Sequence, residues 1–141
     1  MWQRQRLHYF IASFDYSISD LLVIDCASFV AGPAAGTILG DFGARVIKVE
    51  PPGQGDGYRY LRFLPGLPDS ESNYPWALTN RNKESLALDL KQAEGRAFLD
   101  TLVARADVFI TNYPLPVRRR LKLEYEDLRS VNPKLIYASL T

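Results

Sequence analysis

The sequence has almost none of the residues that disulfide scaffolds and metal centres require. Its 141 residues include one cysteine, Cys26, and one histidine, His8, so the chain alone can build neither a disulfide framework nor a Cys/His metal site. Lys and Arg total 17 against 16 Asp and Glu, a net charge of +1. That balance gives no electrostatic reason to expect nucleic acid or an anionic membrane as a partner. The low cysteine content is typical of a cytoplasmic protein.

Long apolar runs are missing as well. No stretch approaches the roughly 18 apolar residues that a membrane span needs. Arg4 and Arg6 precede an apolar segment, but His8 interrupts that segment, Asp15 follows it and no A-x-A cleavage pattern is present. The segment therefore differs from a signal peptide. We expect residues 1–20 to form a poorly ordered N-terminal extension.

The residues that are present predict an α/β domain. The chain is 47% hydrophobic and 23% charged, which is typical of a globular protein. Short apolar runs predict strands at residues 21–26, 45–50, 85–90, 107–111 and 135–140. Helices are predicted at residues 34–42, 74–80, 93–106, 117–121 and 125–131, and residues 51–75 are predicted to form a long loop. This alternation indicates a Rossmann-like open parallel sheet with flanking helices.

The predicted helix at residues 34–42 has a stripe of small residues. Gly32, Gly36 and Gly40 recur every fourth residue, which lets one face lie close to a sheet or to a ligand. Pro33 suits the first helical position, and Gly43 suits a left-handed end. On the helix at residues 93–106, one face is predicted to carry Ala97, Phe98, Leu102 and Val103.

A ligand is expected beyond the carboxyl ends of the parallel strands, where the loops gather. The first of these loops, residues 27–33, has the sequence ASFVAGP. It contains neither G-x-G-x-x-G nor a Gly-Lys-Ser/Thr ending. The loop therefore does not support a dinucleotide or an ATP site.

Three ordered blocks of the sequence carry family motifs. Residues 23–56 read VIDCASFVAGPAAGTILGDFGARVIKVEPPGQGD, residues 80–95 read NRNKESLALDLKQAEG, and residues 104–141 read ARADVFITNYPLPVRRRLKLEYEDLRSVNPKLIYASLT. Together they resemble the N-terminal portion of class III CoA-transferases, the CaiB/BaiF family. The resemblance implies that residues 21–141 are a truncated, N-terminal part of the large domain of this family.

The resemblance also implies a ligand and its binding residues. CoA or acyl-CoA is expected as a substrate, with a carboxylic acid as the second substrate and no tightly bound cofactor. The positions that match family CoA contacts are Val30, Ala31, Leu88, Asp89, Leu90, Lys91, Asn112, Tyr113, Pro114 and Arg120. Lys91 and Arg120 are cations suited to the phosphates of CoA.

Three positions depart from the family pattern. Val30 stands where some members have a glutamine that helps to hold the thioester, and valine cannot form that hydrogen bond. Residues 112–116 contain two prolines and no glycine, which stiffens the turn and removes backbone donors. Glu84 replaces a frequent arginine.

The resemblance places the family's catalytic Asp nucleophile beyond Thr141, so we name no catalytic residue. Asp25 is expected to be structural, and Cys26 is expected in the core. Two other functions remain open: an alpha-methylacyl-CoA racemase of the same family, whose acid/base pair would also lie past Thr141, and a non-catalytic CoA-binding or assembly module or gene remnant. The resemblance implies a homodimer for full-length members, or a C-terminal partner chain if the gene is split.

Overall fold

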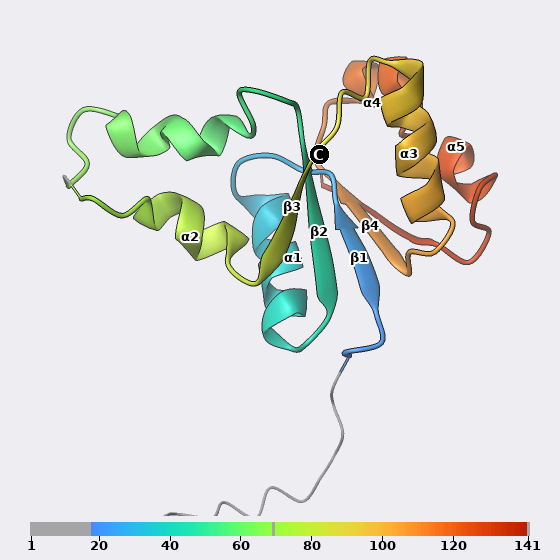
Figure 1. The fold of residues 1–141 in the computed structure, drawn as a ribbon, viewed down its shortest axis with the longest axis horizontal. Coiled ribbons are helices and arrows are strands. Elements are labelled where there is room, and N and C mark those ends of the chain that lie inside the picture. Colours follow the sequence, from blue (N-terminus) through green and yellow to red (C-terminus); the bar gives the residue numbers. More distant parts are fainter. Residues whose placement is uncertain (1–17, 69, 141) are drawn as a thin grey trace, which may run out of the picture.

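A five-stranded parallel sheet forms the centre of the fold (Figure 1). The computed structural model describes residues 18–68 and 70–140. The strands lie in the order β3-β2-β1-β4-β5; their bounds are β1 (Leu22–Asp25), β2 (Arg45–Glu50), β3 (Lys83–Ala87), β4 (Val108–Thr111) and β5 (Ile136–Ser139). The strand order reverses beside β1, which pairs with both β2 and β4. The predicted α/β sheet is therefore confirmed.

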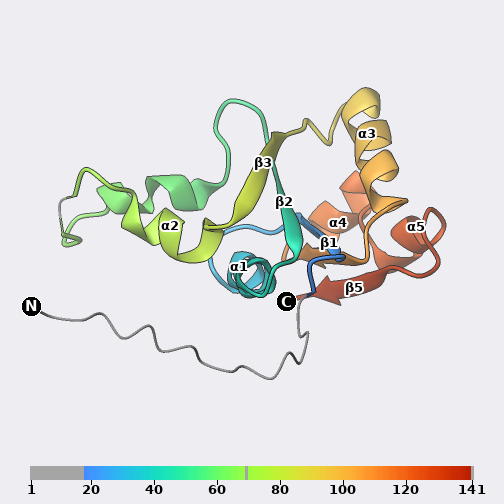
Figure 2. The same ribbon diagram turned by 60° about the horizontal axis from the view of Figure 1, so that its bottom comes forward.

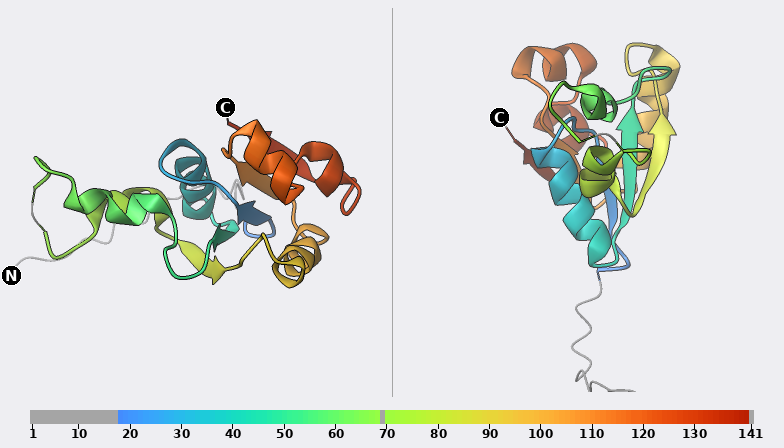
Figure 3. Two further views of the ribbon diagram at one scale, coloured as in Figure 1. Left: turned by 90° about the horizontal axis from the view of Figure 1, so that it is seen from above. Right: turned by 90° about the vertical axis from the view of Figure 1, so that its left-hand side faces the viewer.

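Helices cover both faces of the sheet. Their bounds are α1 (Ala31–Asp41), α2 (Tyr74–Asn80), α3 (Ala93–Val103), α4 (Leu115–Leu121) and α5 (Tyr125–Arg129). Alternate strand residues point to opposite faces, so Ile24 packs with Leu99 of α3 and Leu128 of α5. Its neighbour Val23 belongs to the cluster against which Leu39 of α1 packs. Figure 3 shows α1 and α3 on opposite sides of the sheet.

Part of the predicted loop at residues 51–75 is helical instead. Residues Gly57–Phe63 form a 3-10 helix, η1, which begins where the Asp56 carboxylate accepts the Tyr58 N–H. η1 and α2 lie side by side and project from the side of the fold next to β3 (Figures 1 and 2). The Asp56 carboxylate caps the start of this helix. The sequence of residues 57–63 has no helical repeat of apolar residues from which the helix could have been predicted.

Several predicted boundaries were wrong. Helix α1 begins at Ala31, so Pro33 is its third residue and not its first. Strand β3 covers Lys83–Ala87, because the apolar alternation of residues 85–90 continues beyond the paired backbone. In α3, Phe98 is 47% exposed, and Leu99 and Val103 are the buried residues.

The glycine stripe of α1 permits close packing, as predicted. A Cβ at Gly32 would collide with the Cβ of Ala27, and one at Gly36 would lie 3.3 Å from Asp25 Oδ2. Gly43 follows the helix with φ +104°, a conformation that glycine adopts readily.

Two parts of the sequence-based prediction fall at the ends of the chain. Most of the expected extension, residues 1–17 including His8, lies outside the described residues, and so does Thr141. The statement that the family's Asp nucleophile lies beyond Thr141 therefore stays a prediction. Of the expected extension, Ile18 is described, and it packs against the apolar cluster under α1.

No helix in the described part of the chain has the length and apolar character to cross a bilayer.

Candidate functional site

A cleft of about 300 Å³ lies at the carboxyl ends of β2, β3 and β4. Its walls are residues 49–51, Gln54, residues 88–91, Tyr113, Val117, Arg120 and Leu121. A parallel sheet gathers its loops at this edge, which is where a ligand was expected. Six of the ten predicted positions line the cleft: Leu88, Asp89, Leu90, Lys91, Tyr113 and Arg120.

The cleft continues into a groove of about 420 Å³ between α3 and α4. The cleft and the groove share four lining residues, and the charged residues that only the groove has are Arg96, Asp100 and Lys122. The shared residues are Leu90, Lys91, Arg120 and Leu121. Arg96 is already engaged, because it bonds Asp100 and the backbone oxygens of Leu121 and Lys122. Lys91 and Arg120 form no ion pair with another residue of the described ranges. Their charges are therefore available to an anionic ligand.

The other four predicted positions do not line the cleft. Val30 and Ala31 are exposed at the start of α1, and Pro114 is exposed immediately before α4. Asn112 joins the two loops: its Oδ1 accepts the Ser28 N–H at 2.7 Å, and its Nδ2 donates to the Ser28 carbonyl at 2.7 Å. In this structure the Asn112 amide therefore holds the first loop.

Comparison with known proteins decides the family. A family model described as CoA-transferase family III matches residues 18–141. The chain belongs to CoA-transferase family III. The match covers all three sequence blocks that carried the resemblance, and it begins at Ile18, the first described residue that packs on the fold.

Individual relatives agree with this assignment. The chain is 46% identical over 119 residues to the acetyl-CoA:oxalate CoA-transferase of Acetobacter aceti, covering 84% of this chain and 30% of that protein. It is 40% identical over 124 residues to the cinnamoyl-CoA:phenyllactate CoA-transferase of Clostridium sporogenes, covering 87% and 30%. A crystal structure of a CaiB/BaiF family protein from Brucella suis matches with a TM-score of 0.76 and 42% identity, covering 86% and 32%. The chain therefore spans about 30% of the length of the curated relatives it matches.

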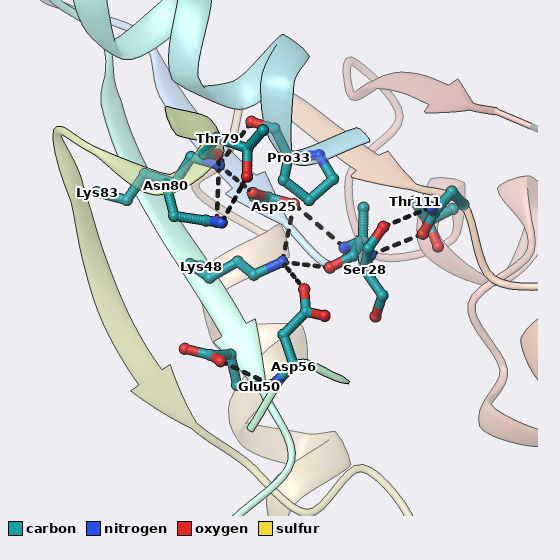
Figure 4. A network of polar contacts seen from close by, with 12 residues as sticks. Asp25, Ser28, Pro33, Lys48, Glu50, Asp56, Thr79, Asn80, Lys83 and Thr111 are labelled. Carbon is teal, nitrogen blue, oxygen red and sulfur yellow. Dashed lines mark hydrogen bonds and ion pairs between the residues drawn. The ribbon is translucent and has the colours of Figure 1, made fainter. Parts of the chain in front are cut away.

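Beneath the first loop of this family III chain lies a buried ionic network (Figure 4). Lys83 Nζ lies 2.7 Å from Asp25 Oδ2, and Lys48 Nζ lies 3.0 Å from Asp56 Oδ2 and 3.8 Å from Asp25 Oδ1. Burial lowers the pKa of the Lys83 ammonium, although the charge of Asp25 opposes that shift. Two cations face two carboxylates, so the network is balanced in charge. Asp25 is fully buried in this network, where it bonds Lys83 and the Ala27 N–H; its structural role stays a prediction.

Sequence reasoning missed Lys48, Asp56 and Lys83. For Lys48, the sequence did contain a signal of a buried ion pair. Lys48 interrupts the apolar run of β2, and a charged residue inside a buried parallel strand requires a buried partner. Asp56 is eight residues away, beyond the strand, and only the folded chain brings the two together.

Glu50 connects this network to the cleft that it lines. Its Oε1 accepts the Asp56 N–H at 2.9 Å, and Arg59 donates to both carboxylate oxygens at 2.8 and 2.6 Å. Burial alone would raise the pKa of Glu50, but the hydrogen bonds from Arg59 and Asp56 outweigh it and lower the pKa. The Arg59 guanidinium also stacks on Trp76, 3.7 Å from the ring centre. Glu50 is therefore an anion at the cleft, fixed on both oxygens.

Cys26 is buried in the core and interacts with Tyr113, which lines the cleft. Burial raises the pKa of the Cys26 thiol from 9.0 to about 12, and the nearby Asp25 charge adds to the rise. Burial also raises the pKa of Tyr113, which interacts with Cys26 and Ser28. Both groups are therefore neutral at physiological pH. No group of three His, Cys, Asp or Glu within residues 18–68 and 70–140 is placed to hold a metal ion.

We expect native Cys26 to resist alkylation. At pH 8 the thiol is fully buried and protonated, so iodoacetamide should react at least about a hundredfold more slowly than with the chain in urea. Because the folded pKa is raised, the contribution of Cys26 to stability is complete below pH 9 and is lost as the pH rises toward 12. Mass spectrometry of this single-cysteine chain measures the reaction directly. Equal rates in buffer and in urea would contradict the burial of the thiol.

Proposed function

We propose that this chain is the N-terminal, CoA-binding portion of an acyl-CoA:carboxylate CoA-transferase. The observation that supports it best is the cleft at the carboxyl ends of the strands, whose two cations, Lys91 and Arg120, form no ion pair within residues 18–68 and 70–140. Relatives named as CoA-transferases for oxalate and for phenyllactate support the substrate class, an acyl-CoA thioester and a carboxylic acid. The chain covers about 30% of those relatives, so the transfer reaction belongs to the proposal for the whole protein.

The charges of the cleft suggest how CoA would lie in it. Lys91 and Arg120 line both the cleft and its continuation between α3 and α4. Arg offers a bidentate fork and Lys a point charge to phosphate oxygens. The walls of the cleft that the groove does not share include Val49, Leu88 and Tyr113, which suit the less polar pantetheine arm. In this orientation the phosphates lie near α4 and the thiol end lies near the first loop.

This binding role fits the chemistry of CoA transfer. When a carboxylate attacks the thioester carbonyl, the C–S bond breaks and the CoA thiolate leaves with its electron pair. The attack forms a C–O bond and so an anhydride; the thiolate then attacks the other carbonyl carbon of that anhydride, which forms the new thioester and releases the first acid as a carboxylate. CoA must therefore stay bound between the two steps. The residues proposed here would hold CoA through that exchange by its nucleotide and its arm. We assign no catalytic residue to the chain, because the family's Asp nucleophile is predicted to lie beyond Thr141.

Titration calorimetry with CoA tests the proposal. Arg120→Ala should weaken CoA binding about tenfold, because a charge-assisted bond to phosphate is lost. Binding should also weaken as salt rises, and dephospho-CoA should bind less tightly than CoA.

Arg119→Ala is the matched control. Arg119 is adjacent on α4, is 66% exposed in its side chain, pairs with Glu124 and lines neither cavity. Its removal should leave the affinity for CoA unchanged. Equal binding by wild type and Arg120→Ala, or tighter binding of NAD than of CoA, would refute the site.

A further inference from the structure

Phe29 adopts a backbone conformation that is uncommon for its residue type. Its φ is +64°, in the left-handed region that glycine favours. A strained residue persists only where its surroundings hold it, and such residues gather at functional sites. Phe29 lies in the first loop, directly before Val30 and Ala31. Its ring occupies space that the absence of a side chain at Gly57 leaves open, since a Cβ there would lie 3.3 Å from Phe29 Cζ.

The contacts that hold Phe29 come from Asp56. The Phe29 N–H donates to both carboxylate oxygens of Asp56, each at 3.2 Å. The same carboxylate accepts the Tyr58 N–H at 2.9 Å and the Lys48 ammonium at 3.0 Å. Lys48 also donates to the carbonyl of Ala27, two residues before Phe29. Lys48 and Asp56 are 1% and 3% exposed, so neither can reach a ligand itself.

The opposite side of the loop is fixed independently. Asn112 holds both backbone groups of Ser28, and its neighbour Tyr113 lines the cleft. Glu50, also in the cleft wall, accepts the N–H of Asp56. The loop is thus bonded on one side to Asn112, the neighbour of the cleft residue Tyr113, and on the other to Asp56, whose N–H bonds the cleft residue Glu50. None of the residues 27–33 of this loop lines the basic groove.

From this geometry we infer that Lys48 and Asp56 are positioning residues for the thiol end of CoA. They hold Phe29 in its left-handed conformation and so fix the backbone of residues 29–31 beside the cleft. The inference rests on the proposed function, because it takes CoA as the ligand and places the pantetheine near this loop. It assigns Lys48 and Asp56 a role that the other buried pair, Asp25 and Lys83, does not share, since neither member of that pair bonds to Phe29.

The test compares two ligands that use different parts of the cleft. CoA should reach both the cations and the loop, whereas adenosine 3′,5′-bisphosphate, its nucleotide part, should reach the cations alone. The variant is Lys48→Met/Asp56→Leu, which removes one buried charge of each sign and so leaves no uncompensated ion. If the double variant does not fold, the single variant Asp56→Asn is measured instead. It should also weaken the binding of CoA.

We expect the double variant to bind CoA about tenfold more weakly, because the loop must then be ordered on binding. Its affinity for the bisphosphate should change by less than about twofold. Asn132→Ala is the control for a general loss of stability. The Asn132 side chain bonds the carbonyls of Val103 and Ala106 at 2.9 and 2.7 Å, far from the loop, and its loss should spare both affinities.

Hydrogen exchange of the Phe29 amide gives a readout that does not depend on CoA. The amide should be protected in wild type and in Asn132→Ala and should exchange faster in the double variant. Unchanged protection of this amide overturns the inference, as does an equal loss of affinity for both ligands or a loss for neither. If wild type binds no CoA, the proposed function fails, and the exchange measurement alone decides whether Asp56 holds Phe29.

Discussion

Asp25→Asn should destabilise the folded chain by about 3–5 kcal/mol, the range for removing one partner of a buried ion pair. The Asp25 carboxylate is fully buried and lies 2.7 Å from Lys83 Nζ and 3.8 Å from Lys48 Nζ. It also accepts the Ala27 N–H at 3.2 Å. Without its charge, two buried ammonium groups share only the carboxylate of Asp56. That imbalance is large against a total stability of about 5–15 kcal/mol for a domain of this size.

Urea unfolding followed by circular dichroism measures this effect. Glu84→Gln is the control, since Glu84 pairs with Arg45 at 2.7 Å but both side chains are more than half exposed, at 56% and 59%. Its midpoint should stay close to wild type. Asp25→Asn/Lys83→Met should recover part of the loss, because it removes one charge of each sign. Equal midpoints for Asp25→Asn and Glu84→Gln would show that the network does not stabilise the fold.

The sequence predicts the elements of this fold where local signals are strong. The run RVIKVE is bounded by Gly43 before it and Pro51 after it, and β2 covers the predicted residues 45–50. Helix α2 likewise covers the predicted residues 74–80, with a proline at the start and an Asn73 cap. In these segments the residues that start and stop the element are adjacent to it. The residues next to these two elements are therefore enough to predict where each begins and ends.

The parts that were missed depend on contacts between distant segments. The left-handed conformation of Phe29 requires a carboxylate 27 residues away, and no rule of composition predicts it. The helix η1 follows from the cap at Asp56, which itself is held by Lys48 and Glu50. In the cleft, too, residues with a local signal were predicted, and a residue that depends on a distant partner was missed. Its walls at residues 88–91 were predicted from strand ends and family motifs, whereas Glu50 was missed because its partner Arg59 lies beyond the strand.

Gly95→Ala should destabilise the chain by about 2 kcal/mol, within the range for overpacking a close contact. Gly95 is the third residue of α3. A Cβ there would overlap the carbonyl oxygen of Asp89 and lie 2.9 Å from its carbonyl carbon. The Asp89 backbone cannot yield freely, because its oxygen accepts the Gln92 N–H and its carboxylate accepts the Lys91 N–H. The added methyl group must therefore push the loop before α3 away from the helix.

The same displacement should weaken CoA binding, since Asp89 and Lys91 line the cleft. Urea unfolding measures the loss of stability of Gly95→Ala, and titration of the same preparation with CoA measures its loss of affinity. Gly66→Ala is the control: its φ is +86° but a Cβ would meet nothing within 4 Å, so it should cost about 1 kcal/mol from backbone strain and leave CoA binding unchanged. Helix propensity alone favours alanine at position 95 by about 1 kcal/mol. A stabilised Gly95→Ala chain with normal CoA affinity would therefore mean that the contact between α3 and Asp89 is looser than the structure has it, and that residues 88–91 do not form a fixed wall.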